Sequence, residues 1–80
     1  MHVWFDEDET HTESRVTIHL RDYELTGFGR AQRRPHDPNL PAVGEELAAA
    51  RAMSDLAHQL LDLATYQLEK LEGHPIHVDL

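Results

Sequence analysis

The stretch GEELAAARAMSDLAHQLLDLATYQLEKLEG, residues 44–73, decides the fold of this chain. Its apolar residues recur at steps of three and four, which return side chains to the same side of an α-helix. They form two neighbouring stripes, a first stripe of Leu47, Ala50, Ala57, Leu61, Ala64, Leu68 and Leu71 and a second stripe of Ala49, Met53, Leu56, Leu60 and Leu63. Two stripes predict a helix that buries more of its circumference than one small sheet covers, and hence contact with a partner.

Glycines and charged residues mark the ends expected for this helix. It is expected to begin near Gly44, with Glu45 and Glu46 in a first turn where carboxylates stabilise the positive end of the helix dipole. Gly73 is a typical stop, because a proline follows it two residues later. The apolar pattern weakens near residue 65, so a continuous helix and a bent one both fit the sequence.

The residues before the helix alternate as those of β-strands do. Residues 3–5, 15–21 and 24–31 are expected to form three strands, which short connections make antiparallel. A polar loop or a ragged hairpin connection is expected over residues 6–14, and a turn at residues 22–23. The apolar face of the middle strand is formed by Val16, Ile18 and Leu20.

The third strand carries small residues on one face. Gly27, Gly29 and Ala31 alternate with larger side chains, and glycine within a strand favours the close approach of another backbone. We therefore expect the helix to lie tightly against this face. The sequence predicts an α+β fold in a single domain over residues 1–80: a three-stranded antiparallel sheet with a long or bent C-terminal helical segment packed on one face.

Two further segments flank the helix. Prolines at positions 35, 38 and 41 predict a stiff, extended connector over residues 33–43. After the helix, apolar residues at positions 76, 78 and 80 alternate with polar ones, which predicts a short C-terminal edge strand.

Composition excludes several classes of protein. The 80 residues include no cysteine, so a disulfide framework and a thiolate site are both excluded. No apolar run approaches the roughly 20 residues of a membrane span. The acidic start of the chain is unlike a secretory signal, so we expect a cytoplasmic protein without membrane contact. The formal net charge of −8 disfavours non-specific binding to nucleic acid.

No group of residues typical of catalysis or metal binding stands out. Ser54 and His58 approach each other at i, i+4 on the helix, but no nucleophile elbow or oxyanion-hole motif accompanies them. His58 and Asp62 supply only two ligands, whereas zinc usually takes four. We therefore expect no enzyme, no catalytic residue, no metal site, no cofactor and no small-molecule substrate.

Basic residues gather in one part of the acidic chain. Arg30, Arg33 and Arg34 lie within five residues, whereas residues 6–9 are all acidic. Arg15 and Arg21 lie on the polar face expected for the middle strand. These five arginines are the candidates for contact with phosphate groups.

The stretch LTGFGRAQRRPHDPNLPAVGEELAAARAMSDLAHQLL, residues 25–61, resembles a family of small actinobacterial proteins of unknown function with a dsRBD-like fold. The matching residues are Gly27, Gly29, Ala31, Pro35, Asp37, Pro41, Gly44, Glu46, Leu47, Ala50, Arg51, Ala52, Ser54, Asp55, Leu56 and Ala57. The resemblance implies a dimer. Some members are associated with dormancy or low-oxygen stress, and one is similar in shape to ribosome hibernation promoting factors, which implies ribosome binding by analogy of fold.

Two functions from different classes are therefore expected. The first is a non-enzymatic stress or dormancy protein that binds the ribosome or structured RNA as a homodimer, through the five arginines. The dimer interface expected for it consists of Met53, Leu56, Leu60 and Leu63. The alternative is a protein–protein adaptor whose acidic surface recognises a basic partner. A histidine-based metal or pH sensor is a third expectation, suggested by the seven histidines.

Overall fold

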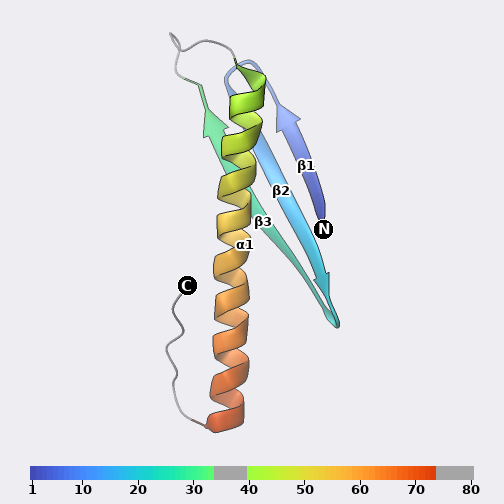
Figure 1. Cartoon of the computed structure of the whole chain (residues 1–80), viewed down its shortest axis with the longest axis vertical. Helices are drawn as coiled ribbons and strands as arrows, with labels where there is room; N and C mark the ends of the chain where they lie inside the picture. Colours follow the sequence, from blue (N-terminus) through green and yellow to red (C-terminus); the bar gives the residue numbers. More distant parts are fainter. Residues whose placement is uncertain (34–39, 74–80) are drawn as a thin grey trace.

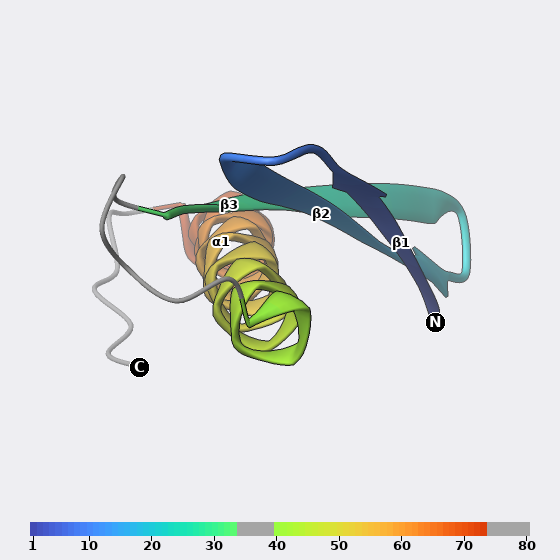
Figure 2. The same cartoon turned by 90° about the horizontal axis from the view of Figure 1, so that it is seen from above.

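Three antiparallel strands and one long helix make up the fold (Figure 1). The structure, a computed structural model, describes residues 1–33 and 40–73. Strands β1 (His2–Glu7), β2 (His11–Leu20) and β3 (Tyr23–Gln32) form an open sheet in the order β1-β2-β3, and helix α1 spans Pro41–Glu72. Figure 2 shows α1 on one face of the sheet, while the opposite face is not covered by any described element. The predicted α+β class and sheet are confirmed.

The strands are longer than the apolar pattern indicates. Of the two alternatives for residues 6–14, the loop is wrong and the hairpin connection is confirmed, but it is shorter than expected because β1 continues to Glu7 and β2 begins at His11. The carboxylate of Asp8 closes the short turn between them by accepting hydrogen bonds from the backbone amides of Thr10 (2.8 Å) and His11 (2.9 Å). Charged residues continue both strands because their side chains stay in solvent while their backbones pair.

The turn between β2 and β3 lies one residue earlier than expected. Leu20 pairs with Tyr23, so the two loop residues are Arg21 and Asp22, and Tyr23 already belongs to β3. Arg21 has a φ of 48°, in the left-handed region that two-residue hairpin loops require and that glycine favours.

The core is small and rests on the close approach of α1 to β3. Val16, Ala52 and Leu56 form its buried centre. A Cβ atom added at Gly27 would overlap the carbonyl oxygen of Ala52, and the same substitution at Gly29 would bring Cβ against the helix backbone. The glycine face of the third strand thus seats the helix, as predicted.

Three helix side chains bind the outer edge of β3, and we call this set the edge ladder. It consists of Arg51, Asp55 and Gln59, which follow one another by one helical turn. Their partners alternate along the strand: the carbonyl oxygen of Arg30 accepts from Arg51 (2.6 Å), the amide of Phe28 donates to Asp55 (2.8 Å), and the carbonyl oxygen of Thr26 accepts from Gln59 (2.8 Å). These bonds satisfy backbone groups that an open sheet edge would offer to another strand.

The edge ladder also decides which stripe of the helix meets the sheet. Leu56, from the second stripe, is buried in the core, and Leu60 packs against it. Leu47 and Leu68, from the first stripe, stay largely exposed. The second stripe is expected to contact another protomer or another helical segment; this expectation is wrong for Leu56, which lies in the core, and Leu60 packs partly against the same core. Both stripes are apolar, so the polar bonds to β3 fix the rotation of α1.

The helix begins earlier than expected and ends where expected. Its first turn starts at Pro41, where a proline needs no hydrogen bond for its missing N–H. The extended connector predicted over 33–43 is therefore wrong at its end, and the first turn holds no acidic residue. At the other end Gly73 adopts φ 73° and donates its amide to the carbonyl oxygen of Glu69 (2.7 Å). The helix is continuous through residue 65. The predicted edge strand at residues 76–80 lies outside the described residues.

Candidate functional site: the open face of the sheet

Two aromatic rings and an arginine form a row across the face of the sheet that α1 leaves open. Trp4 on β1 pairs with Arg15 on β2, and Arg15 pairs with Phe28 on β3. Successive strand residues point to opposite faces, so these three side chains lie opposite Val16, Gly27 and Gly29, which face the helix. Trp4 is 46% exposed and Phe28 is 61% exposed. We call Trp4, Arg15 and Phe28 the open-face row.

Ring contacts join Trp4 to Arg15 within the open-face row, and to His2 beside it. The guanidinium carbon of Arg15 lies 5.8 Å from the centroid of the Trp4 ring, within the range of a cation–π interaction. The imidazole of His2 stacks on the same indole, with ring centroids 5.4 Å apart and planes inclined by 24°. Planar groups of β1 and β2 therefore stack beside one another at the surface, and Phe28 continues the row on β3.

Charged groups of both signs border the open-face row along one side, toward the turn between β1 and β2. Glu13 pairs with Arg30 on β3 and with Asp6 on β1. A hollow of about 570 Å³ covers this end of the face, and its lining includes Trp4, Arg15, Phe28 and Arg30 together with Asp6 and Glu13. Along the opposite side of the row the hydroxyl groups of Thr17 and Thr26 share a hydrogen bond of 2.8 Å.

The structure divides the predicted arginines among different surfaces. Arg15 and Arg30 lie on the open face, as the strand register requires. Arg21 lies in the turn at the far end of the hairpin. Arg33 follows β3 and donates to the carbonyl oxygen of Glu9 (2.9 Å), so it serves the neighbouring turn. Arg34 lies outside the described residues. The cluster expected from Arg30 and Arg33 is therefore not a single patch, because strand alternation and the turn separate them.

Trp4 and Phe28 are not among the site residues predicted from the sequence. A signal for Phe28 was present, since it stands between Gly27 and Gly29 and must point away from the helix that those glycines seat. Trp4 could be placed beside Arg15 only once the register between β1 and β2 was known.

The four residues expected at a dimer interface have different surroundings. Leu56 is buried in the core and is not available to a partner, because the edge ladder turns it toward the sheet. Leu60 packs partly against the same core, and Leu63 is half-buried. Met53 remains 46% exposed.

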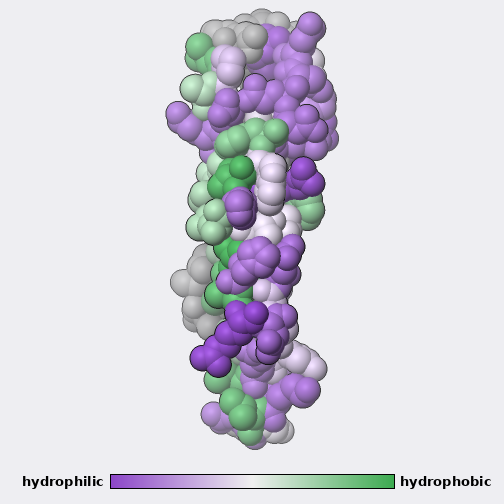
Figure 3. All heavy atoms as spheres, turned by 90° about the vertical axis from the view of Figure 1, so that its right-hand side faces the viewer, coloured by the Kyte–Doolittle hydropathy of each residue, from purple (hydrophilic) through white to green (hydrophobic). Residues whose placement is uncertain are grey.

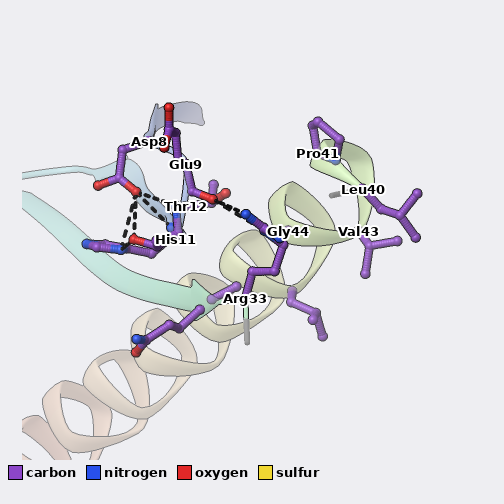
Figure 4. Close-up of a pocket in the computed structure, with 13 residues that line it drawn as sticks. Asp8, Glu9, His11, Thr12, Arg33, Leu40, Pro41, Val43 and Gly44 are labelled. Atoms are coloured by element: carbon purple, nitrogen blue, oxygen red, sulfur yellow. Dashed lines mark hydrogen bonds and ion pairs between the residues drawn. The ribbon is translucent and has the colours of Figure 1, made fainter. Parts of the chain in front are cut away.

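A second concave site lies where α1 begins (Figure 4). This pocket, of about 250 Å³, lies between the turn after β1 and the first helical residues, and Leu40, Pro41 and Val43 supply apolar walls. Its polar groups already bind one another: Asp8 accepts from Thr10 and His11, and the carbonyl oxygen of Glu9 accepts from Arg33. These bonds stabilise the turn, so we place the functional site on the open face.

Two carboxyl groups near this pocket have shifted pKa values. The backbone amides of Thr10 and His11 lower the pKa of Asp8 below its ordinary value of 3.8 by donating hydrogen bonds to the carboxylate. A hydrogen bond with the Glu45 carboxyl raises the pKa of Glu7 above its ordinary value of 4.5, because two carboxyl groups in contact retain a proton more readily.

Residues 1–33 and 40–73 hold neither a grouped set of metal ligands nor a helix suited to a membrane. No three histidine or carboxylate side chains in these ranges are grouped as metal ligands, and the Nδ1 of His58 donates to the carbonyl oxygen of Ser54 (2.7 Å). No helix in the same ranges combines the length and the apolar character that crossing a membrane requires.

Comparison with known proteins places the chain among mycobacterial relatives. The profile of a family described as Rv2632c-like matches residues 1–77. The uncharacterised protein Mb1767 of Mycobacterium bovis is 39% identical over 73 residues, which cover 91% of this chain and 78% of that protein. The uncharacterised protein Rv2632c of Mycobacterium tuberculosis is 32% identical over 74 residues, 92% of this chain and 80% of the relative. The crystal structure of Rv2632c superposes with a TM-score of 0.84 at 32% identity, over 92% of this chain and 88% of that one. The chain belongs to the Rv2632c-like family.

Proposed function

We propose that this chain is a non-enzymatic cytoplasmic protein of stress or dormancy that binds unpaired bases of structured RNA, those of the ribosome in particular, on the open face of its sheet. The open-face row of Trp4, Arg15 and Phe28 is the observation that carries the proposal. The resemblance to small dsRBD-like proteins, one of them similar in shape to ribosome hibernation promoting factors, supports the choice of the ribosome by analogy.

The row has the chemistry that unpaired bases need. Bases splayed out from loops and bulges stack on aromatic rings and on arginine guanidinium planes, and an open sheet is a common platform for such stacking. The spacing between neighbouring strands, about 4.8 Å, sets the three planar groups at intervals that successive unstacked bases can span.

The charge of the molecule points to unpaired bases as the target. Duplex binding relies on many phosphate contacts, and a chain of net charge −8 with Arg15 and Arg30 on the open face makes few of them. Stacking contributes about 1–3 kcal/mol per base and does not depend on the sign of the protein's charge.

Trp4 is the one tryptophan of the chain, so intrinsic fluorescence reports directly on this face. A titration with a short single-stranded RNA is expected to quench the emission, and the matched duplex is expected to leave it unchanged. With two phosphate contacts, the logarithm of the binding constant should fall with the logarithm of salt concentration with a slope of about −1.4.

Ribosomes supply the second test. The full chain is expected to sediment with ribosomes at low salt, and a Trp4→Ala, Phe28→Ala double variant is expected to remain in the supernatant. Constant Trp4 emission together with absence from the ribosome pellet at low salt would contradict the proposal.

A protein–protein adaptor is the second candidate, and the carboxylates of the same face favour it. Asp6, Glu13 and Glu24 outnumber Arg15 and Arg30 there. Tryptophan and arginine are also the residues that dominate protein interfaces. Quenching of Trp4 by a lysine- and arginine-rich peptide, with no response to RNA, would favour this candidate over RNA binding.

A further inference from the structure

The face of α1 that points away from the sheet carries a heptad repeat. Steps of four and three residues alternate without interruption along nine positions, as the a and d positions of a coiled coil do. We call these positions the outer stripe: Val43, Leu47, Ala50, Ser54, Ala57, Leu61, Ala64, Leu68 and Leu71. Leu47 is 45% exposed and Leu71 is 84% exposed, so the apolar side chains at both ends of the stripe meet solvent in the single chain.

The last turns of α1 extend past the sheet (Figure 1). The helix has 32 residues and is about 48 Å long, whereas the ten residues of β2 and of β3 span about 34 Å. Gln67 donates a hydrogen bond to the hydroxyl of Tyr23 at the start of β3 (3.3 Å). Helical turns without a packed neighbour are marginal in water, so this end of α1 needs contact along its apolar side.

We infer that a second copy of this chain covers the outer stripe, with the two α1 helices packed antiparallel about a twofold axis at the height of residue 59, on the side away from the sheet. In this register alanine meets leucine in two kinds of layer: Ala57 packs against the partner's Leu61, and Ala50 against the partner's Leu68. Ser54 packs against the partner's Ala64, and Leu47 against the partner's Leu71 at the two ends.

The order of large and small residues selects the antiparallel arrangement. In a parallel pair each residue meets its own copy, so the three successive layers at Ala50, Ser54 and Ala57 would hold small residues alone and pack loosely, while those at Leu68 and Leu71 would each hold two leucines. The antiparallel pair evens out these volumes and places the positive end of each helix dipole beside the negative end of the other. Alanine in the inner layers lets the helix axes approach to about 8 Å.

The surface that such a pair buries is near the smallest that a specific interface needs, about 1,000 Å² in total. The part of the stripe that is paired, from Leu47 to Leu71, is about 36 Å long and about 12 Å wide, so it buries about 430 Å² on each copy, about 860 Å² in total. Met53, 46% exposed on the flank of the stripe, adds to this area. Figure 3 shows hydrophobic residues along the length of one side of the molecule.

The sheets lie on the outside of this dimer. Because α1 separates each sheet from the interface, the two open faces point away from each other, and the arginines of the two copies form two separate patches. Each dimer therefore presents two copies of the open-face row, on opposite sides.

Sedimentation equilibrium of the full chain at micromolar concentration tests the inference. The expected mass is twice the 9.2 kDa of one chain. Leu61→Lys, which places a charge in a central layer, is expected to give the monomer mass with helical circular dichroism retained. Asp62→Lys introduces the same residue at the next position, outside the stripe, and is expected to remain dimeric. A monomeric wild type, or equal dimerisation of the two variants, would overturn the inference.

Cysteine cross-linking tests the antiparallel register without disturbing the fold, because the chain has no cysteine of its own. A mixture of Ala50→Cys and Leu68→Cys chains is expected to cross-link under mild oxidation, and neither chain is expected to do so alone. Cross-linking of each variant with itself would show a parallel pair and overturn the register.

The Leu61→Lys monomer also separates this inference from the proposed function. Its Trp4 emission should respond to single-stranded RNA as the wild type does, since the open face lies on the far side of the sheet. If neither the wild type nor Leu61→Lys binds RNA while the wild type is dimeric, the proposed function is contradicted and the inferred dimer is supported.

Discussion

The backbone amide of Phe28 donates a hydrogen bond of 2.8 Å to the Oδ2 of Asp55, so a helix side chain takes the place that a fourth strand would occupy beside β3. The same carboxylate accepts from Gln59 (3.2 Å), which itself binds the next carbonyl oxygen along the strand. Helix and strand edge are thereby joined by polar bonds as well as by the core.

Replacing Asp55 should therefore loosen the sheet edge. Asp55→Ala is expected to lower the free energy of unfolding by about 1 kcal/mol, because the amide of Phe28 and the side chain of Gln59 each lose a partner. Urea denaturation measures the effect. Asp55→Asn keeps an oxygen acceptor, so its loss of unfolding free energy is expected to be smaller. Asp62→Ala, elsewhere on α1, is expected to leave the unfolding free energy unchanged. Equal losses for the Ala and Asn variants would argue against the edge ladder.

Gly29→Ala should be among the most damaging single substitutions in the chain. The added Cβ would meet the backbone of α1 near Ala48 and Ala52, and a helix backbone cannot move aside as a flexible side chain can. The expected loss is about 3 kcal/mol, at the upper end of the range for overpacking. The control is Gly73→Ala, where the Cβ meets open space and the left-handed backbone alone costs about 1 kcal/mol. If Gly29→Ala and Gly73→Ala lost similar amounts of stability in thermal unfolding, the close contact between α1 and Gly29 would be contradicted.

Arg21→Gly should stabilise the protein. Arg21 has a φ of 48°, and a left-handed conformation costs an L-residue roughly 1–2 kcal/mol. Part of that gain is offset by the greater freedom of glycine in the unfolded chain, which leaves about 0.5–1 kcal/mol. Asp22→Gly, at the neighbouring residue whose φ is not positive, is expected to destabilise instead. RNA affinity should not change with Arg21→Gly, since this turn lies at the far end of β2 from Arg15.

Phe28→Ala should weaken the binding of single-stranded RNA while leaving the fold intact. Loss of one stacked base corresponds to about 5- to 150-fold in affinity, or about 1–3 kcal/mol. Because Phe28 is 61% exposed, its removal takes little from the core, and the unfolding midpoint is expected to stay the same. Tyr66→Ala removes an aromatic ring of similar exposure from α1 and is expected to bind RNA normally. Fluorescence titration of Trp4 compares the three proteins.

Acid should weaken the turn between β1 and β2. The pKa of Asp8 is lowered in the folded chain, so its stabilising effect is full above the ordinary value of 3.8 and is lost as the pH falls through the folded-state value. The stability advantage of the wild type over Asp8→Ala is therefore expected to shrink below pH 3.8.

Glu7 acts in the opposite sense. Its pKa is raised in the folded chain, so its contribution to stability is greatest below pH 4.5 and declines as the pH rises through the folded-state value. Glu7→Gln should remove that decline. The midpoints of urea unfolding, measured for the wild type and the two variants as the pH is varied around these values, test the predictions for Asp8 and Glu7.

Much of the fold follows from the sequence because its signals are local. Alternation in residues 15–21 and 24–31, the paired glycines of β3 and the stop at Gly73 each depend on neighbouring residues alone, and each has its counterpart in the structure. The strand ends were misjudged where charged residues such as Asp6 and Glu13 continue the pairing, because backbone hydrogen bonds form whatever the side chain in solvent is.

The rotation of α1 and the position of the site depend on distant residues. Both stripes of the helix are apolar, so periodicity alone does not distinguish the side that meets the sheet. The choice depends on Asp55 reaching the amide of Phe28, 27 residues away in sequence. The candidate site likewise depends on a register that joins Trp4, Arg15 and Phe28 across three strands. Grouping arginines by their proximity in sequence placed Arg30 and Arg33 together, whereas the structure assigns them to different surroundings.

The pairing of β1 with β2 has a consequence for how a ligand is held. All six residues of β1 are exposed, and the strand is joined to the sheet along its border with β2. Such a strand detaches at a lower free energy than global unfolding requires, so its amides should exchange with solvent before those of β2. Trp4 belongs to this strand, and a molecule stacked on it binds only while the strand is in place. Occupancy of the open face and order in the first seven residues are thus thermodynamically linked, and each reinforces the other by the same factor.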